Sequence, residues 1–566
     1  MATLDYPTAS LRGQFFKHIS ASTGPERFTA LALLLLAGLL LLPVFAVFYL
    51  ALQPSGDIWK HLIINVLPQS TATTLWLMLG VGLLVFILGI TCAWLVTMCD
   101  FPGRKFFDVA LLLPFAVPTY IIAFSYVELL DYSGPVQSTI RSLFGFQSAR
   151  DYWFPEIRSL GGAIFVMGFV LYPYVYLTTR ASFLIQSACT LDVSRTLGAG
   201  PLRLFWKVAV PLARPAIVVG MTLALIECLN DIGAVTFFGV KTLSFSVYDT
   251  WLNRSSLAGA AQISCAMILI VLALMYLENY GRRKQRFHQS TGTYRSLQTY
   301  QLSGWRSALA LLACALPVLL GFFIPASLLA HRALRRLDTL LTAELWQAAV
   351  NTLVLSTIAS LLAVAISLIL AYALRTNNSP MNRTIGKLTT LGYALPGTIL
   401  AVGILFPVAW LDNIIADGAE KYLGFATGLI LLGSGAALVY AYVVRFLAVS
   451  YGQVHGGFAK TSPHLDMVSR TLGRSSLQTL LRINLPMLKP VLLTATLLAF
   501  VECMKELPTT LLLRPFNFET LATTVFNAAS REAFEDASLP ALTIVLVGVI
   551  PVMLLARSSS ATFRRK

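Results

Sequence analysis

The hexapeptide Val-Ser-Arg-Thr-Leu-Gly occurs twice, at residues 193–198 and again at residues 468–473. Each copy leads into a basic stretch that ends at a proline, Pro211 in the first copy and Pro486 in the second. The hexapeptide and the proline recur at the same separation, from 193 to 468 and from 211 to 486. Because a repeat of so long a period produces two similar halves and not a short-repeat solenoid, the chain is predicted to be a duplication of one fold.

The composition indicates that most of this chain lies in a lipid bilayer. Of its 566 residues, 57% are hydrophobic and only 12% are charged, and the mean hydropathy is +0.73. Soluble domains carry about twice that charged fraction. The sequence therefore predicts a polytopic membrane protein with no stretch left over for a large soluble domain.

Twelve apolar runs are long enough to cross a hydrocarbon core of roughly 30 Å as helices. They cover residues 28–52, 72–98, 109–127, 160–179, 216–240 and 257–277 in the first half, and residues 307–330, 345–374, 388–411, 425–444, 491–513 and 539–556 in the second. An even number of spans in each half makes the halves parallel repeats, with the path between them. We therefore expect an all-α membrane protein of about twelve transmembrane helices in two six-helix repeats. Its predicted parts are an N-terminal segment 1–27, a first half 28–280, a linker 281–306 and a second half 307–566.

The formal charge of +16 would suit a nucleic-acid binder, but the basic residues gather in alternate loops. They concentrate at residues 104–105, 195–214, 282–286 and 564–566. The positive-inside rule makes that side the cytoplasm, so both termini are predicted to be cytoplasmic and no nucleic-acid partner is expected. Arg332, Arg335 and Arg336 fall on the opposite side and count against this orientation, but they are the minority.

Motifs for metal, disulfide or nucleotide chemistry are missing from the sequence. The seven cysteines form no C-x-x-C pair, and the six histidines lie outside the apolar runs. The phosphate-binding pattern G-x-x-x-x-G-K-[ST] does not occur, because Gly386-Lys387 is followed by leucine and lacks the first glycine. We therefore expect no cofactor, no metal centre and no ATP hydrolysis by this chain itself.

The repeated hexapeptide lies in polar loops of about residues 186–214 and 459–489. An acidic residue favours the start of a helix and a glycine favours its end, so each loop is predicted to present a short helical knob to the cytoplasm. The proline that follows begins the next span, where its missing N–H leaves no hydrogen bond unmade. An ordinary hairpin is the alternative, but two copies at matched spacing favour a docking helix. The residues assigned to these docking loops are Asp192, Ser194, Arg195, Gly198 and Pro211 in the first half, and Asp466, Ser469, Arg470, Gly473 and Pro486 in the second.

This pattern resembles the Glu-Ala-Ala loop of permeases in binding-protein-dependent ABC importers, which continues to a glycine and closes with Ile-x-Leu-Pro. The closing residues match as Val208-Ala209-Val210-Pro211 and Ile483-Asn484-Leu485-Pro486. The acidic start departs from the pattern, because Asp192-Val193-Ser194 replaces Glu-Ala-Ala and Asp466 is displaced by one residue. The resemblance implies a type I importer-like transmembrane fold. It also implies two cytoplasmic ATPase subunits, a homodimer that holds ATP and Mg²⁺ and receives these loops.

Charged residues well within the apolar runs occur in only two of them, the runs that follow the docking loops. They are Glu227 and Asp231 in the first half, and Glu502, Lys505 and Glu506 in the second. Each acidic pair has i, i+4 spacing, which predicts one helix face for both carboxylates. Buried carboxylates cost at least about 2.5 kcal/mol each at a bilayer centre and therefore face a partner or a polar cavity. Hydrogen bonds between helices with a Lys505 ion pair are one explanation. We hypothesise that the acids line the path or gate of a cationic substrate.

The sequences around these acids resemble the ferric-iron permeases among these importers. The stretch Glu-Cys-Leu-Asn-Asp-Ile-Gly-Ala-Val at residues 227–235 is similar to their first half. The stretch Lys-Glu-Leu-Pro-Thr-Thr-Leu-Leu-Leu-Arg-Pro-Phe-Asn-Phe-Glu-Thr-Leu-Ala-Thr at residues 505–523 is similar to their second half. The resemblance implies Fe³⁺ as the substrate, a periplasmic or lipoprotein binding protein that delivers it, and a place in the bacterial inner membrane.

Other functions stay open at this point. Thiamine and polyamines are also cationic and are carried by related permeases, whereas the acidic runs disfavour anions. An ion-coupled secondary transporter could use the same carboxylates and would need no ATPase. A membrane-embedded enzyme is weaker, because no His, Ser or Cys constellation accompanies the acids.

Overall fold

The computed structural model describes residues 24–185, 194, 196–198, 200–282, 299–335, 342–376, 386, 392, 395–425, 427–459, 461–462 and 464–564. The helices of the first half are α2 (Gly24–Ala51), α3 (Asp57–His61), η1 (Leu62–Val66), α4 (Leu67–Met98), α5 (Arg104–Ala110), η2 (Leu113–Ala116), α6 (Thr119–Leu130), α7 (Pro135–Phe144), α8 (Leu160–Ile185), α10 (Pro201–Leu204), η3 (Phe205–Ala209), α11 (Val210–Asn230), α12 (Gly233–Phe237), α13 (Leu243–Leu252) and α14 (Leu257–Arg282). Those of the second are α15 (Trp305–Val318), η4 (Leu319–Phe323), α16 (Ile324–Arg335), α18 (Ala343–Thr376), α20 (Gly397–Leu423), α21 (Ala436–Ala459), α22 (His464–Thr471), α23 (Ser476–Thr479), η6 (Leu480–Asn484), α24 (Leu485–Met504), α25 (Pro508–Leu513), α26 (Leu521–Ser530) and α27 (Phe534–Arg564).

Eleven helices among the described residues are long and apolar enough to cross a membrane. A twelfth crossing is present if the bent pair Arg104–Ala116 and Thr119–Phe144 counts as one span. The prediction of an all-α protein with about twelve membrane helices is therefore confirmed. β1 (Cys99–Asp100) and β2 (Tyr300–Gln301) form a short parallel strand pair. This pair joins the segment just before α15 to the end of α4.

The duplication is visible in matched local structure. α10, η3 and α11 begin at residues 201, 205 and 210, and α23, η6 and α24 begin at the corresponding positions of the second half, 476, 480 and 485. A hydrogen bond repeats as well, because the N–H of Leu243 donates to Thr74 Oγ1 at 3.0 Å and the N–H of Leu521 donates to Thr352 Oγ1 at 2.8 Å. Each bond fixes the helix after the charged segment to the second long span of its own half.

The apolar run predicted at residues 109–127 is not a straight span. α5, η2 and α6 divide it, and the chain bends by 90° at the break. Pro118 has an extended ψ of 141° directly before α6, because a proline cannot donate to the preceding turn and its ring would clash there. The same device recurs at Pro396, with ψ of 142°, and α20 begins at Gly397. Of the run predicted to begin at residue 388, residues 388–391 and 393–394 lie outside the described residues.

The run predicted at residues 425–444 is also shifted. α21 occupies Ala436–Ala459, so it begins later and ends later than the hydropathy suggests. Gly424, Gly428 and Gly435 all have positive φ, which interrupts the helix before residue 436. As a consequence, polar residues after residue 444 lie inside the helical bundle.

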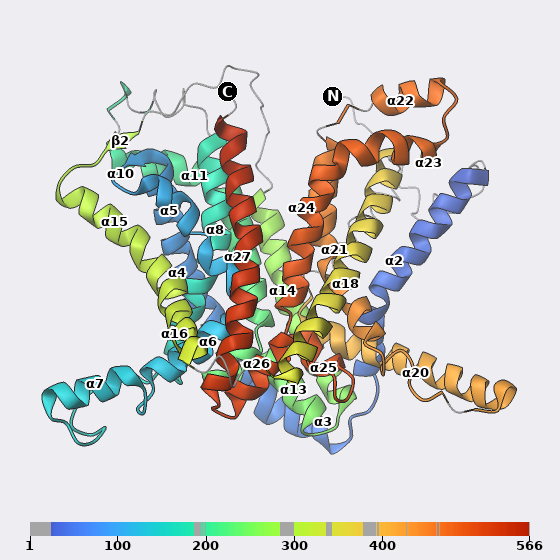
Figure 1. The fold of residues 1–566 in the computed structure, drawn as a ribbon, viewed down its shortest axis with the longest axis horizontal. Helices are drawn as coiled ribbons and strands as arrows, with labels where there is room; N and C mark the ends of the chain where they lie inside the picture. Colours follow the sequence, from blue (N-terminus) through green and yellow to red (C-terminus); the bar gives the residue numbers. More distant parts are fainter. Residues whose placement is uncertain are drawn as a thin grey trace, which may run out of the picture.

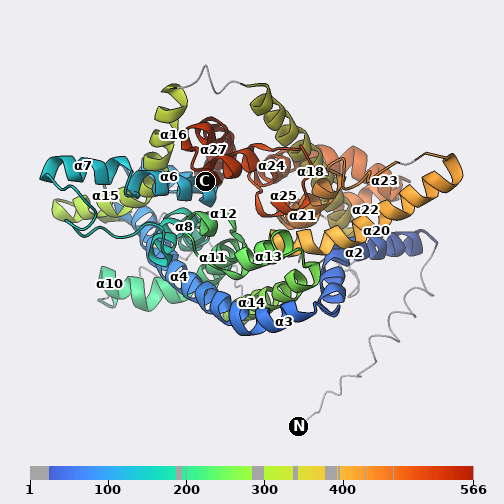
Figure 2. The same ribbon diagram turned by 90° about the horizontal axis from the view of Figure 1, so that it is seen from below.

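The first span of each half crosses over to the other half. α2 packs along α20, where Gly403 allows contact that a Cβ would prevent, since it would lie 2.2 Å from the Pro43 carbonyl oxygen (Figure 2). In the other direction, the first span of the second half packs on the first half through η4. There Tyr126 donates a hydrogen bond of 2.8 Å to the Leu320 carbonyl. The two halves are therefore interlocked.

The molecule has two distinct ends (Figure 1). α10, α22 and α23 lie at the upper end of the figure, where α2 begins and α27 ends. α3, α13, α25 and α26 lie toward the lower end. α7 and the C-terminal part of α20 extend sideways at this lower level, in opposite directions. The long helices converge toward the lower end and diverge toward the end that carries α10 and α22.

Candidate functional site

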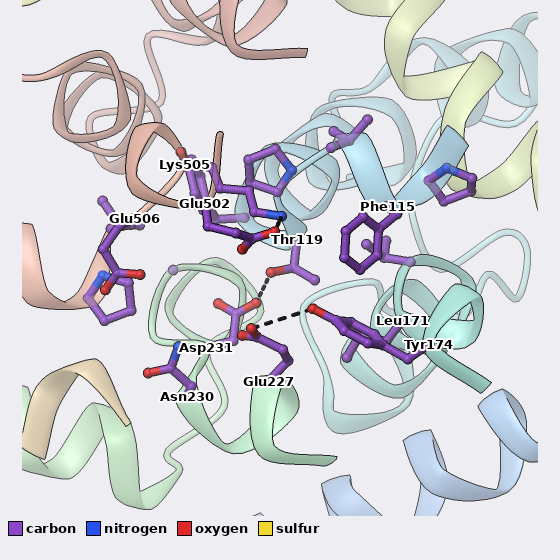
Figure 3. A pocket seen from close by; sticks show the side chains of 18 of the residues that line it. Phe115, Thr119, Leu171, Tyr174, Glu227, Asn230, Asp231, Glu502, Lys505 and Glu506 are labelled. Carbon is purple, nitrogen blue, oxygen red and sulfur yellow. Dashed lines mark hydrogen bonds and ion pairs between the residues drawn. The ribbon is translucent and has the colours of Figure 1, made fainter. Parts of the chain in front are cut away.

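A cavity of about 80 Å³ lies where the two halves meet (Figure 3). It is lined by the breaks that follow α11 and α24, by the Pro114–Tyr120 turn, and by α8 and α21. The polar side chains that line it are Thr119, Tyr120, Tyr174, Glu227, Asn230, Asp231, Arg445, Glu502, Lys505 and Glu506. The structure therefore brings together all five charged residues that the sequence singled out within the apolar runs.

The second acid of each pair lies outside its helix, so the prediction of a shared helix face is wrong. α11 ends at Asn230, and Asp231 Oδ1 accepts a hydrogen bond of 2.8 Å from the N–H of Ala234 at the start of α12. Glu506 Oε1 accepts the equivalent bond of 3.1 Å from the N–H of Thr509, which corresponds to Ala234 in the duplication. A carboxylate before a helix satisfies its free N–H groups, which explains why the predicted spans 216–240 and 491–513 each split here.

The first acid of each pair occupies the last turn of its helix. Glu502 forms an ion pair of 2.8 Å with Lys505 in the same break. Glu227 lies 3.5 Å from the hydroxyl of Tyr174, which donates to it, and 4.0 Å from a guanidinium nitrogen of Arg445. Lys505 also stacks over the ring of Phe115 at 4.8 Å, so it contacts the first half.

Arg445 is the charged residue of the cavity that sequence reasoning missed. Only 4% of its surface is exposed, and its Nη1 lies 3.2 Å from Glu506 Oε1 and 3.1 Å from Asn230 Oδ1. The predicted span ended at Val444, directly before the arginine, because a hydropathy run stops where a charge begins. The helix itself continues to Ala459. Extending the span by one helical turn would have placed this charge in the membrane.

Two equivalent positions differ in a way that makes room for this arginine. In the first half Thr119, directly after Pro118, donates a hydrogen bond to Asp231. Its counterpart directly after Pro396 is Gly397, where a Cβ would lie 2.3 Å from Arg445 Nη1 and 2.7 Å from Glu506 Oε1. The glycine therefore leaves the space that the guanidinium fills, and the two sides of the cavity are not alike.

The cavity holds four carboxylates and two cationic groups, which gives a formal charge of −2 if all are ionised. Two carboxylates come from each half, so the negative charge is shared across the interface. Within the described part of the chain, no group of three or more His, Cys, Asp or Glu is arranged to hold a metal ion. The arrangement suits transient contact with a cation, because oxygen ligands are present without a closed coordination shell.

The second docking loop forms a clamped helix at the end of the molecule away from this cavity (Figure 1). Asp466 pairs with Arg375 at the end of α18 at 2.5 Å and accepts a hydrogen bond of 2.9 Å from Asn484. Ser469 and Thr479 share a buried hydrogen bond of 2.8 Å. Gly473 has φ of +79° just after the helix, the left-handed value that a helix end requires. Arg470 is exposed, and Pro486 lies in the first turn of α24.

The first docking loop is described only in part. Asp192 and Arg195 lie outside the described residues, whereas Ser194 is half-buried and Pro211 lies in the first turn of α11. Gly198 has φ of +80°, matching Gly473. The tips also match, because Leu197 is 81% exposed and the corresponding Leu472 is 75% exposed. Both loops therefore present an apolar side chain at the same end of the molecule, far from the acidic residues.

Comparison with known proteins finds a matching family and several similar transport proteins. Residues 85–286 match the family described as binding-protein-dependent transport system inner membrane component. The chain is 25% identical to the Fe(3+)-transport system permease protein FbpB 2 of Haemophilus influenzae, over 86% of this chain and 90% of that protein. It is 22% identical to the ferric transport system permease protein FbpB of Actinobacillus pleuropneumoniae, over 83% of this chain and 69% of that protein.

A relative of half the length also matches. The sulfate transport system permease protein CysT of Synechococcus elongatus is 27% identical over 45% of this chain and 89% of its own length. A protein of one half's size thus aligns almost completely with part of a chain that contains the same unit twice. The chain is therefore similar to inner membrane components of binding-protein-dependent transport systems, and it contains the repeated unit twice.

Proposed function

We propose that this protein is the permease of an ABC importer, and that it imports ferric iron across the bacterial inner membrane by alternating access, driven by separate ATPase subunits. The observation that carries the proposal is the meeting of four carboxylates, two from each half, around one cavity at the interface. Two relatives that align with more than four-fifths of the chain have ferric transport in their names, which supports the same cargo.

The chemistry of the cavity supports a hard cation. Carboxylate oxygens are the ligands that such ions prefer, and the cavity offers them from opposite sides. A conduit must release its cargo, so a path without a complete coordination shell is suited to passage and not to storage. Fe³⁺ is the substrate in this proposal, and no resident metal is needed.

The docking loops supply the link to the motor. We place the end that carries α10 and α22 in the cytoplasm, with both chain termini on that side. Leu197 and Leu472 would then each seat in one of two ATPase subunits, which form a homodimer and bind ATP and Mg²⁺. A periplasmic or lipoprotein binding protein would deliver its cargo at the opposite end. Closure of the ATPases moves both loops together, and nucleotide drives the cycle only because it binds the two conformations unequally.

Two other classes of cargo are organic cations and anions. Thiamine and polyamines are cations and would fit the same carboxylates. Anions such as sulfate fit less well, because Lys505 and Arg445 both pair with carboxylates and the remaining charge is negative. The cargo test therefore includes two organic cations and one anion as competitors.

The test is uptake of radioactive iron by proteoliposomes that contain the permease, its ATPase subunits and the binding protein. We expect uptake that requires ATP, stops with vanadate and persists with an uncoupler, and that excess thiamine, spermidine or sulfate does not reduce. The double variant Glu227→Gln, Glu506→Gln should lower uptake at least about tenfold, because the cation loses charges that line its path. Glu344→Gln, an exposed glutamate at the start of α18, is the matched control.

Unchanged uptake in the double variant would remove the support for an acidic path. Collapse by the uncoupler with vanadate harmless would instead identify an ion-coupled secondary transporter. Inhibition of iron uptake by one competitor would identify that compound as the cargo in place of iron.

A further inference from the structure

Arg445 joins the two halves at the centre of the cavity. It comes from α21 in the second half, and its guanidinium reaches Glu506 in its own half at 3.2 Å. It also reaches across to the first half, to Asn230 Oδ1 at 3.1 Å and toward Glu227 at 4.0 Å. One side chain thus connects acidic or polar groups of both halves, and it is almost entirely buried.

The duplication does not account for this residue. The Tyr-x-Tyr sequence at Tyr172 and Tyr174 in α8 recurs at Tyr440 and Tyr442 in α21. Continuing this alignment along both helices places Leu177 opposite Arg445, so the first half has no equivalent charge in α8 at this level. Gly397 in place of a second threonine completes the difference. The arginine and the space for it form a feature that only one half possesses.

We propose that Arg445 is a resident counter-cation that locks the two halves together at the cavity, and that a cationic cargo must displace it to pass. This inference rests on the proposed cation path. The guanidinium is permanently charged and is held by oxygen atoms of both halves. An entering cation competes for the same oxygens and repels the guanidinium, so cargo binding and separation of the halves become one event. The lock thereby makes opening conditional on a cation.

The guanidinium also has an aromatic neighbour on its own helix, because its central carbon lies 5.5 Å from the ring centroid of Phe446. Lys505 differs in kind, because its carboxylate partner Glu502 is in the same half and its contact with the first half is the Phe115 ring. Of the two cations in the cavity, Arg445 is therefore the one that bridges oxygen atoms of both halves.

An anion would gain nothing from this exchange. To bind the guanidinium it would have to replace Glu506 while the remaining carboxylates repel it. The lock therefore selects for positive charge, and it is a specificity-determining device as well as a gate.

The experiment measures ATP hydrolysis by the complete complex in nanodiscs, with and without Fe³⁺-loaded binding protein. In the wild-type complex we expect low hydrolysis alone and stimulation by the loaded binding protein. Arg445→Gln should raise hydrolysis without binding protein at least about tenfold, because truncating one partner of a buried charge pair removes the lock. The ratio of stimulated to unstimulated hydrolysis should fall toward one. Arg445→Lys keeps the positive charge but loses the planar guanidinium with its several fixed N–H donors, because an ammonium is a compact charge. Its unstimulated hydrolysis should therefore lie between those of the wild-type complex and Arg445→Gln.

Arg180→Gln is the matched control. Arg180 lies on α8, is buried, and pairs with Asp108 at 2.6 and 2.7 Å outside the cavity. Its loss should lower thermal stability without changing the stimulation ratio. If Arg445→Gln is not recovered as a folded complex, the lysine variant decides.

Wild-type hydrolysis and stimulation in a folded Arg445 variant would overturn the lock. If the wild-type complex is not stimulated by Fe³⁺-loaded binding protein, the ferric assignment fails. The rise in unstimulated hydrolysis still decides the lock in that case, because this measurement uses no cargo.

Discussion

The backbone N–H of Gly397 donates a hydrogen bond of 2.6 Å to Asn230 Oδ1, across the interface between the two halves. The same oxygen accepts from Arg445, so one amide at the end of α11 organises both the start of α20 and the guanidinium. The absence of a side chain at residue 397 is what allows these groups to come together.

Gly397→Ala should therefore abolish the arrangement. The added Cβ would lie 2.3 Å from Arg445 Nη1 and 2.4 Å from Thr509 Oγ1, so the guanidinium has to leave its partners. We expect ATP hydrolysis without binding protein to rise at least about tenfold, as for loss of the arginine itself. Gly418→Ala on the same helix is the control, because no atom lies within 4 Å of its Cβ position. Equal behaviour of the two variants would show that the close approach at residue 397 is unimportant.

Asp466→Asn should detach the second docking helix. The charge pair with Arg375 is largely buried, and removing one partner of such a pair costs about 3–5 kcal/mol. We expect a lower thermal unfolding temperature and reduced recovery of ATPase subunits with the purified permease. Asp417→Asn, an exposed aspartate on α20, should change neither. Full retention of ATPase subunits by the Asp466 variant would show that the Asp466–Arg375 ion pair is not needed to hold the docking helix.

The exposed leucines of the docking loops should contribute directly to ATPase binding. Leu197→Asp and Leu472→Asp each place a charge on an apolar tip, and each should weaken association by at least about tenfold, with the double variant weaker still. The readout is co-purification of ATPase subunits and uptake in proteoliposomes. Leu143→Asp, 74% exposed on α7 at the other end of the molecule, is the control. Association that survives in the double variant would contradict the docking role of these loops.

The repeated threonines provide a test of the duplication in energetic terms. Thr74→Val and Thr352→Val each leave a buried N–H unsatisfied, at Leu243 and Leu521 respectively, which costs about 1–3 kcal/mol. We expect similar losses of stability in thermal unfolding, and additive losses in the double variant. Thr139→Val on exposed α7 should be nearly neutral. Strongly unequal effects would mean that the two bonds are not equivalent.

The sequence predicted the repeat and the membrane class, because both depend on composition and on spacing along the chain. It also brought Glu227, Asp231, Glu502 and Glu506 to notice, since charges inside apolar runs stand out. It did not predict that Asp231 and Glu506 lie beyond their helices. The i, i+4 rule assumes a continuous helix, although Gly233 and Pro508 just after these acids are residues that end one.

Hydropathy could not identify Arg445 as a membrane residue, because a run of apolar residues is taken to end at the first charged residue. α21 is shifted from its predicted position because three glycines before it have positive φ. The residue type permits this backbone conformation but does not determine it. The contact of Arg445 with Asn230 joins positions far apart in the chain, one in each half. Such contacts depend on how the halves pack, which local patterns do not specify.

The crossing of α2 onto α20 has a consequence for biosynthesis. Pro43 and Gly403, which touch in the finished protein, lie in different halves of the chain. At roughly 5–20 residues per second, a ribosome needs about 18–72 s to make the second after the first. Throughout that interval the amino-terminal anchor sits in the bilayer with lipid in place of its eventual neighbour. Maturation of the first half must therefore wait for translation of the second.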